Sequence, residues 1–381
     1  MADPFHDAVY LDHAAASPPA AQTLAQWQQY ALHCFANQEA IHLAAYAVRR
    51  ALDEHEARML AALCGPGHDA AVQWTDSGTS ALYHLLSYPG FAAGEVVTTA
   101  AEHAALTAAL GPLDVPVKTV RLCRGRVDLD HLASMLGPAT ATVAIHQVQS
   151  EFGAVQDLTA IRRVIDARAP QARFLADTVQ AAGKLELPWQ AARLDAAIVS
   201  GYKIGVPGGG AIIYRDHDGS PTGLRHFWQR RRREEHRISR PNPPMCLTLA
   251  QTLTELTAQL AANRARLSGL NDELRRELQR RWGERIKWVV EAEAASPYLV
   301  HFLLPGYQGA VLVRMLSEHG VYVASGSACN AETKTPSAAL LAAGIKVKEA
   351  FSGLRLSFSP ATTREELARF LTVFETCLNN Y

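Results

Sequence analysis

The chain has 381 residues, 48% of them hydrophobic, with 37 Lys and Arg against 37 Asp and Glu. Zero net charge argues against nucleic acid or an acidic membrane surface as a partner, and we find no run of 18 uncharged apolar residues that would span a membrane. Residues 1–10 do not resemble a signal peptide, so we expect a cytoplasmic protein, and its length predicts two domains.

The six cysteines include no pair with the C-x-x-C spacing of zinc and thioredoxin motifs, so reduced thiols are expected. The 15 histidines show no H-E-x-x-H or similar spacing, and we propose no metal site. The chain contains only seven lysines, and any chemistry of a side-chain amine must use one of them.

The first half of the chain alternates strand and helix patterns. After an Ala-rich helical region over 20–63, the short run Ala71–Trp74 leads through a small-residue turn into a helix at Ala81–Leu86. Alternating strands and helices, such as the helix at Leu158–Ala167, predict a mainly parallel sheet. Further apolar runs with strand character lie at Glu95–Thr99, Val117–Leu122, Thr142–Ile145, Arg173–Ala176, Ala196–Val199 and Ala211–Tyr214.

The pattern changes after Thr248, where helical spacing continues to about Trp282. We expect one long helix there, with Ser268-Gly269 as the place for a break. Beyond it, the sequence predicts a smaller α+β domain with strands at Lys287–Glu291 and Pro297–Leu304 and helices at Ala310–His319 and Thr363–Leu378.

Lys203 follows the strand Ala196–Val199 and precedes a Gly-rich turn. A lysine in a pocket at the end of a strand can form a Schiff base with an aldehyde, although a surface lysine in a turn has the same local pattern. Asp177 ends the previous strand, 26 residues earlier. A carboxylate there suits the pyridine nitrogen of pyridoxal 5′-phosphate (PLP), and an ordinary helix N-cap is the alternative.

The turn Ser77–Ser80 opens a helix, and its amides and hydroxyls suit a phosphate group. His103, after the strand ending near Thr99, could stack on a flat ring, although a histidine in a satisfied loop is more frequent. Arg230–Arg233 is a short basic run, best explained by a solvated helix or loop face, since the net charge is zero.

Two positions in the last third suggest substrate chemistry. Cys329 lies among small residues in Ala324–Asn330, a composition typical of an exposed, reactive loop cysteine. Arg355 lies inside the alternating strand Leu354–Phe358. An arginine there needs a partner, either a substrate carboxylate or a structural Asp or Glu.

In their order and spacing, these motifs resemble the group I cysteine desulfurases of the class V aminotransferase family, nearly from end to end. The resemblance also includes Tyr10–Ala16, Glu102-His103, Glu151–Gln156, Gly183-Lys184, the Ser-Gly-Ser-Ala-Cys loop ending at Cys329, Pro336–Gly344 and Thr362–Glu366.

The resemblance implies a PLP-dependent transferase of fold type I. It implies a large PLP-binding domain over 20–255 with a mainly parallel seven-stranded sheet, and a small α+β domain from 1–19 and 256–381. The implied reaction converts L-cysteine to L-alanine, with a persulfide on Cys329 that passes to an acceptor protein. The implied assembly is a homodimer.

The resemblance also implies a role for each motif position. Lys203 would form the Schiff base and move the substrate Cα proton, and Cys329 would attack the sulfur. Arg355 would bind the substrate carboxylate. The cofactor contacts would be the pyridinium with Asp177, the ring oxygen with Gln180, the ring face with His103, and the phosphate with Gly78, Thr79, Ser80 and Ser200. His103 would also help with proton transfer as a catalytic residue.

Several positions depart from the family pattern. Tyr202 replaces the His before the Schiff-base lysine, and Ser150 replaces an Asn that contacts the ring oxygen and substrate. The segments Arg230–Glu235 and Ser239–Asn242 replace two further motifs, and Asn242 is the candidate to replace the Thr that reaches the phosphate of the neighbouring subunit. These changes keep open another PLP reaction, such as selenocysteine lysis, β-elimination or transamination, and a non-catalytic scaffold.

Overall fold

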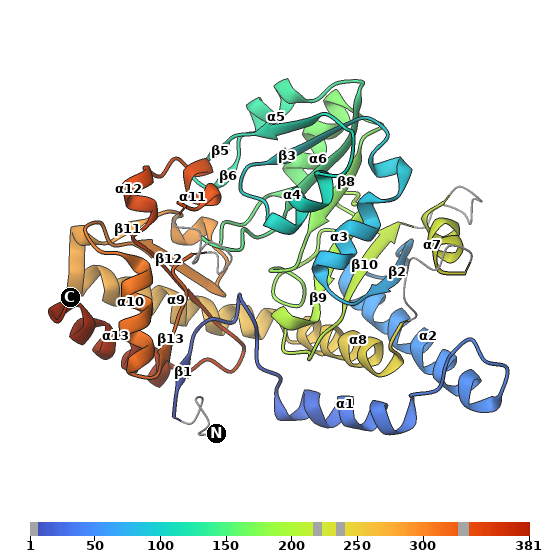
Figure 1. Ribbon diagram of the computed structural model, residues 1–381, viewed down its shortest axis with the longest axis horizontal. Helices are drawn as coiled ribbons and strands as arrows, with labels where there is room; N and C mark the ends of the chain where they lie inside the picture. The colour runs from blue at the N-terminus through green and yellow to red at the C-terminus, as the bar shows by residue number, and fades with distance from the viewer. Residues whose placement is uncertain (1–6, 216–222, 234–240, 327–334) are drawn as a thin grey trace.

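The computed structural model describes residues 7–215, 223–233, 241–326 and 335–381. Its main feature is a seven-stranded sheet with the strand order β2-β10-β9-β8-β7-β3-β4 (Figure 1). The strand β10 runs antiparallel to its neighbours β2 and β9, and the other pairs are parallel, which confirms the predicted mainly parallel sheet. The strands are β2 (Ala70–Thr75), β3 (Glu95–Thr99), β4 (Val117–Val120), β7 (Thr140–His146), β8 (Arg173–Asp177), β9 (Ala196–Ser200) and β10 (Gly210–Arg215).

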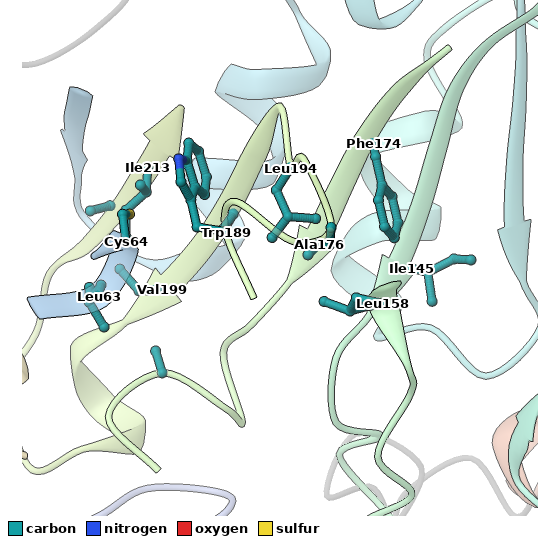
Figure 2. Packing of buried hydrophobic residues seen from close by; sticks show 14 of the residues in the cluster. Leu63, Cys64, Ile145, Leu158, Phe174, Ala176, Trp189, Leu194, Val199 and Ile213 are labelled. Atoms are coloured by element: carbon teal, nitrogen blue, oxygen red, sulfur yellow. The ribbon is translucent and has the colours of Figure 1, made fainter. Parts of the chain in front are cut away.

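Both faces of this sheet are buried, as the continuous apolar strands require. In β10, Ala211 and Ile213 belong to the apolar cluster on one face, whereas Ile212 and Tyr214 belong to the cluster on the other. Figure 2 shows part of the first cluster. That face packs against α2 (Leu43–Cys64), α5 (Leu129–Met135), α6 (Leu158–Arg168) and α8 (Pro243–Ala258), and the other packs against α3 (Gly78–Leu86), α4 (Ala104–Leu110) and α7 (Leu224–Arg233).

A smaller group of elements lies beside the large sheet (Figure 1). It has its own apolar core, built from residues of both ends of the chain, including Val9, Leu11 and Phe374. Its strands are β1 (Val9–Tyr10) with β13 (Val321–Tyr322), and β11 (Lys287–Trp288), β12 (Leu299–Leu303) and β14 (Gly353–Ser357). Its helices are α9 (Leu260–Trp282), α10 (Gly309–Glu318), α11 (Ala338–Ala342), α12 (Val347–Ala350) and α13 (Arg364–Asn379).

The remaining elements are short. The helix α1 (Ala21–His33) precedes α2, and these two helices occupy the helical region expected over 20–63. The strands β5 (Leu122–Cys123) and β6 (Arg126–Val127) form a hairpin, and four 3-10 helices lie at η1 (Pro89–Phe91), η2 (Gly201–Lys203), η3 (Gly283–Arg285) and η4 (Ala292–Ala294). No helix in the described parts of the chain is long and apolar enough to cross a membrane.

The predicted break of the long helix near Ser268-Gly269 is wrong. The interruption lies at Gln259, between α8 and α9. Up to this point the buried side chains of α8 join the core of the large sheet, and beyond it those of α9, such as Leu267 and Leu270, join the smaller core. The helix therefore breaks where it leaves one core for the other, and the burial of Leu267 and Leu270 offsets the small helical cost of Gly269.

The two separate cores support the proposed domain division, 20–255 against 1–19 with 256–381. The N-terminal strand β1 pairs with β13, more than 300 positions later, so the start of the chain packs with its end. This pairing closes the smaller core around α9 and α13.

We predict that Phe374→Ala strongly destabilises the protein. The Phe374 ring is fully buried, stacks on Phe370 with 5.4 Å between centroids and meets Trp282 edge-on at 4.9 Å. Its removal should lower the free energy of unfolding by about 3–5 kcal/mol. Denaturant unfolding measures the change, with Glu375→Ala on the exposed side of the same helix as the control; equal stability of the two variants would contradict this assignment of the core.

Candidate active site

The strands β2, β3, β7, β8 and β9 all end at the same edge of the sheet, because β10 is antiparallel to both β2 and β9. Ligands of open α/β sheets bind at this edge, outside the carboxyl ends of the strands. The residues that follow these ends are Ser77 after β2, His103 after β3, Ser150 after β7, Asp177 at the end of β8, and Ser200 and Lys203 at the end of β9.

A cavity of about 480 Å³ opens at this edge. It also receives Ala14 to Ala16 from the N-terminal segment and Arg355 from β14, so both cores contribute to its wall. The structure places ten of the predicted positions in its lining: Gly78, Thr79, His103, Ser150, Asp177, Gln180, Ser200, Tyr202, Lys203 and Arg355.

Lys203 lies in the short helix η2, directly after β9. Its amine reaches into the cavity and donates a hydrogen bond to the backbone oxygen of Ala15. Neighbouring Gly201 has no room for a side chain, because a Cβ there would lie 2.1 Å from the oxygen of Gly208. A glycine is therefore required at position 201, because the Gly-rich turn folds back against it and holds Lys203 in place.

Asp177 ends β8 beside β9, as the sequence predicts. Its Oδ1 accepts a hydrogen bond of 3.0 Å from the backbone N–H of Val179. Burial raises the pKa of the Asp177 carboxyl, the Glu102 carboxylate raises it further, and the Val179 N–H opposes the shift. A cationic group at this end of the cavity would lower the free energy of the ionised form.

The helix α3 points its N-terminus at the cavity. Ser77 caps it and exchanges two hydrogen bonds with Ser80: Ser80 N donates to Ser77 Oγ, and Ser77 N donates to Ser80 Oγ. Ser80 therefore faces its own helix and does not line the cavity, whereas Ser77 does. The backbone N–H groups of Gly78 and Thr79 in the first turn have no partner within the helix and suit an anion.

The remaining cofactor positions surround the same space. His103 is the exposed N-cap of α4, and its Nδ1 accepts a hydrogen bond from Ala105 N at 3.1 Å. Gln180 donates from Nε2 to the oxygen of Ala14 at 2.9 Å. Ser200 is buried at the end of β9, and Tyr202 lines the cavity with 48% of its surface exposed.

Arg355 has a structural partner, Asp12, which the sequence analysis left as an alternative. Its Nη2 donates to Asp12 Oδ1 at 2.6 Å and its Nη1 to the backbone oxygen of Ser150 at 3.0 Å. Its Nε is buried and has no hydrogen-bond partner within the described parts of the chain. One edge of the guanidinium thus remains for a ligand carboxylate.

Besides Ser80, one further predicted position among the described residues, Asn242, does not line the cavity. Asn242 is the exposed N-cap of α8 and lines a separate cavity of about 150 Å³ with Trp74 and Cys246. Cys329 lies outside the described residues. The described residue closest before it, Gly326, packs on Glu151, because a Cβ there would lie 2.7 Å from Glu151 Oε1.

A buried amine near the cavity was not predicted from the sequence. Lys184 is only 6% exposed, and burial, with Lys203 and Arg355 nearby, lowers its pKa to about 7. Its Nζ lies 5.8 Å from the ring centroid of Tyr298. The Gly183-Lys184 motif was visible in the sequence, but its position beside Lys203 depends on the tertiary fold.

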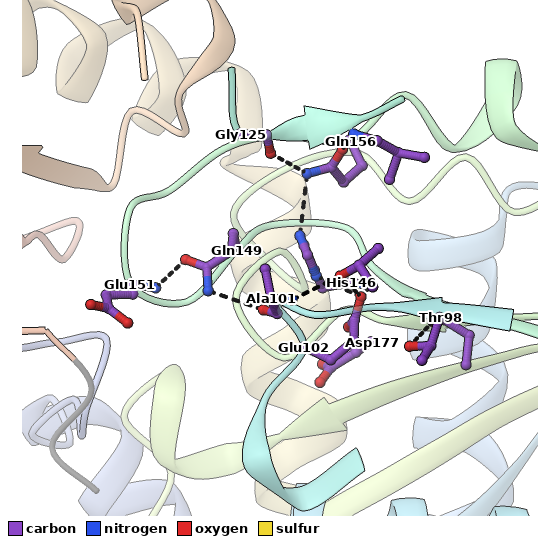
Figure 3. A network of polar contacts seen from close by, with 12 residues as sticks. Thr98, Ala101, Glu102, Gly125, His146, Gln149, Glu151, Gln156 and Asp177 are labelled. Carbon is purple, nitrogen blue, oxygen red and sulfur yellow. Dashed lines mark hydrogen bonds and ion pairs between the residues drawn. The ribbon is translucent and has the colours of Figure 1, made fainter. Parts of the chain in front are cut away.

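The sequence analysis also missed the network beneath Asp177, which contains Glu102, His146 and Gln156 (Figure 3). Glu102 stood next to His103 in a recognised motif, but it had no assigned role, and His146 had no sequence signal beyond the end of a strand. No cluster of three or more His, Cys, Asp or Glu side chains suited to a metal ion occurs in the described part of the chain.

Comparisons with known proteins place the chain in a family and give several relatives. The family model described as aminotransferase class-V matches residues 9–370. A cysteine desulfurase of Gluconacetobacter diazotrophicus is 28% identical over 96% of this chain and 92% of its own length. A selenocysteine lyase of Xenopus laevis is 24% identical over 94% of this chain and 92% of its own length. The solved structure of a NifS-like protein superposes with a TM-score of 0.84 at 21% identity, and covers 98% of this chain and all of its own.

We predict that Asp12→Ala lowers the free energy of unfolding by about 3 kcal/mol, because it leaves the buried Arg355 guanidinium without its carboxylate partner. The double variant Asp12→Ala/Arg355→Met should recover most of the loss, since no buried charge remains. Denaturant unfolding of the two variants and wild type measures both effects. An Asp12→Ala protein as stable as wild type would show that the ion pair does not support this site.

Proposed function

Because the chain belongs to the class-V aminotransferase family, whose cysteine desulfurase members depend on PLP, we propose that it binds PLP at Lys203 and is a cysteine desulfurase. The proposed reaction takes sulfur from L-cysteine, releases L-alanine and leaves a persulfide on Cys329. An acceptor protein then receives the sulfur. A cytoplasmic location is part of the proposal, because the nucleophile must be a reduced thiol.

The cavity fits PLP in size and in the chemistry of its groups. A volume of about 480 Å³ suits a cofactor of this size. The lining supplies a primary amine for the aldehyde, a carboxylate for the ring nitrogen and a helix N-terminus for the phosphate. Gly78 also packs closely below the cavity, since a Cβ there would meet Val179 Cγ2 at 3.1 Å and Ser200 Cβ at 3.2 Å. Only glycine therefore lets this part of the cavity lining pack together without strain.

In this proposal the groups of the cofactor are divided among several residues of the lining. Lys203 holds the aldehyde carbon, Asp177 the ring nitrogen, Gln180 the ring oxygen and His103 the ring face. Ser200 and the N–H groups of Gly78 and Thr79 hold the phosphate. Ser80 is withdrawn from the phosphate site, because its hydroxyl bonds back to Ser77.

Bound PLP withdraws electrons from the substrate Cα. Arg355 orients the substrate by its carboxylate, and the observation that supports this is the buried Nε without a partner. Asp12 and the oxygen of Ser150 hold the other two nitrogens, so the guanidinium is fixed before substrate binds. The Lys203 amine, next to the oxygen of Ala15, is placed to accept and return the Cα proton.

Cys329 is the proposed sulfur acceptor within the chain. The thiolate bonds to the substrate sulfur, the substrate carbon–sulfur bond breaks, and the carbon fragment takes up a proton to become alanine. Cys329 is three residues beyond Gly326, a distance of at most about 10 Å along the chain. Gly326 packs on Glu151, and Glu151 also accepts a hydrogen bond from Ser337 at 2.6 Å, so both stems of the segment lie next to the cavity wall at Ser150.

The observation that carries the proposal is the meeting of Lys203, Asp177 and Arg355 in one cavity, although they come from β9, β8 and β14. Release of selenium from L-selenocysteine, instead of sulfur from L-cysteine, is the second candidate function. The similarity to a selenocysteine lyase favours it, as do the changes at Tyr202 and Ser150, which alter the wall of the cavity.

We predict that the protein with PLP, L-cysteine and a reductant releases sulfide and alanine in equal amounts. Cys329→Ser should abolish sulfide release, and Lys203→Ala should abolish covalent attachment of PLP, as read by mass spectrometry after borohydride reduction. Cys123→Ser, which alters an exposed free thiol, is the matched control and should retain activity.

Turnover that survives Cys329→Ser would assign another PLP reaction. L-selenocysteine offered in competition with L-cysteine tests selenium lysis directly, since a selenium-specific enzyme would release selenide and little sulfide. PLP binding without turnover of either substrate would assign a scaffold.

The proposal includes a homodimer. An exposed apolar stretch joins the end of α1 to the start of α2, where Phe35 is 73%, Ile41 92% and Leu43 86% exposed. Such a stretch is typical of a surface covered by another chain. A second copy is also required if Asn242 is to reach a phosphate, because it does not reach the cavity of its own chain.

We predict that wild type is a dimer by light scattering and that Ile41→Asp with Leu43→Asp shifts it to monomer, because charged groups resist burial at the interface. The monomer should lose PLP affinity if the partner contributes to the site. Arg276→Gln, on the exposed surface of α9, is the control. An active wild-type monomer would contradict the dimer.

A further inference from the structure

A second carboxylate, Glu102, is buried beside Asp177. Its side chain is 2% exposed. Its Oε1 accepts hydrogen bonds from Thr99 Oγ1 at 2.7 Å and His146 Nδ1 at 2.9 Å, and its Oε2 accepts one from the backbone N–H of His146 at 3.0 Å (Figure 3). Donors on both oxygens stabilise the ionised form of a carboxyl group.

The β-sheet register places this pair next to Asp177. His146 ends β7 and is the direct partner of Asp177 across the parallel ladder, and Gln147 N donates to Asp177 O at 2.8 Å. His146 also lines the cavity. Glu102 is therefore hydrogen-bonded to His146, and His146 lies directly opposite Asp177, the proposed ligand of the ring nitrogen.

Gln156 determines which nitrogen of His146 carries the proton. Its Oε1 accepts from Val127 N at 2.9 Å, and its Nε2 donates to Gly125 O at 3.0 Å, so the amide has one orientation. The Nε2 group of Gln156 then lies 3.2 Å from His146 Nε2 as a donor. His146 Nε2 must accept, and the proton of the ring resides on Nδ1, which faces Glu102.

This arrangement leaves the charge of Glu102 uncompensated. Burial is the largest influence on the pKa of His146 and lowers it, but the charge and hydrogen bond of Glu102, together with the charge of Asp177, give a net upward shift. A second proton on His146 Nε2 would point at the N–H of Gln156. This repulsion opposes the upward shift and favours the neutral ring. The charged and titratable groups around Asp177 are Glu102, which raises the pKa of the Asp177 carboxyl, and His103 and His146, which lower it.

We propose that Glu102 is a positioning residue that acts as a second negative charge behind Asp177 and makes this end of the cavity selective for a protonated ring nitrogen. His146 and Thr99 donate hydrogen bonds to the carboxylate, and Gln156 keeps His146 in the tautomer that donates. The inference rests on the proposed function, because it takes Asp177 as the ligand of the PLP ring nitrogen.

The test compares PLP with its 1-deaza analogue, in which carbon replaces the ring nitrogen. Dissociation constants of both for the apoprotein are measured by fluorescence titration. Wild type should bind PLP more tightly, and Glu102→Gln should reduce this preference by about tenfold, the equivalent of one pKa unit, with affinity for the analogue unchanged. Because each preference is a ratio within one variant, a general loss of stability cancels.

Two substitutions at His146 form a matched pair. They provide a second test of the proposal if Glu102→Gln does not fold. His146→Asn keeps an N–H donor close to the position of Nδ1, so it should retain the preference for PLP. His146→Leu removes the donor from a side chain of similar size, so it should lose the preference as Glu102→Gln does.

An equal loss of affinity for PLP and the analogue in Glu102→Gln, or equal behaviour of the two His146 variants, would show a merely structural role and overturn the inference while leaving the PLP site intact. A wild-type protein that binds both ligands equally, or neither, would overturn the proposed contact of Asp177 and the inference with it.

Discussion

The parallel hydrogen-bond ladder of β7, β8 and β9 is the constraint on which the site depends. It pairs His146 with Asp177 and sets Asp177 beside the strand that ends at Ser200. A shift of one residue in this register would turn Asp177 from the cavity into an apolar layer. The register is held by residues such as Phe174 and Ile198, which are fully buried on opposite faces of the sheet, so the core of the large domain determines the geometry of the polar site.

The cavity gathers charges that are costly to bury, and the structure compensates them in different ways. Arg355 has Asp12 and a backbone oxygen, Glu102 has three hydrogen-bond donors, and Lys184 has a pKa lowered to about 7. One of these groups keeps free capacity, because the buried Nε of Arg355 has no hydrogen-bond partner among the described residues. Such incomplete satisfaction is typical of a binding site, since a ligand with the complementary charges then stabilises the folded protein.

The site also joins the two cores. Arg355 belongs to β14 of the smaller core, whereas Ser150 lies in the segment that follows β7 of the large sheet, and their hydrogen bond spans the cavity wall. The segment before Cys329 starts from the same place, because Ala324 and Arg355 exchange backbone hydrogen bonds. A substrate carboxylate at Arg355 would thus contact the element from which the proposed nucleophile extends. Carboxylate binding at Arg355 and the proposed sulfur transfer at Cys329 are 26 positions apart in the sequence. Both would depend on the backbone pairing of Ala324 with Arg355.

The sequence alone determined the alternation of strands and helices, the parallel sheet and the polar residues at the strand ends, because these follow from local periodicity and from short motifs. Lys203, Asp177 and Arg355 were found in this way. Only the tertiary structure decided where side chains point and which distant groups meet: Ser80 turns back to its helix, Asn242 lies outside the cavity, and the long helix breaks at Gln259 between two cores. The pairs Arg355–Asp12 and His146–Glu102 span 343 and 44 positions of the chain. No local pattern reports such contacts, because they arise from the packing of elements and the register of the sheet.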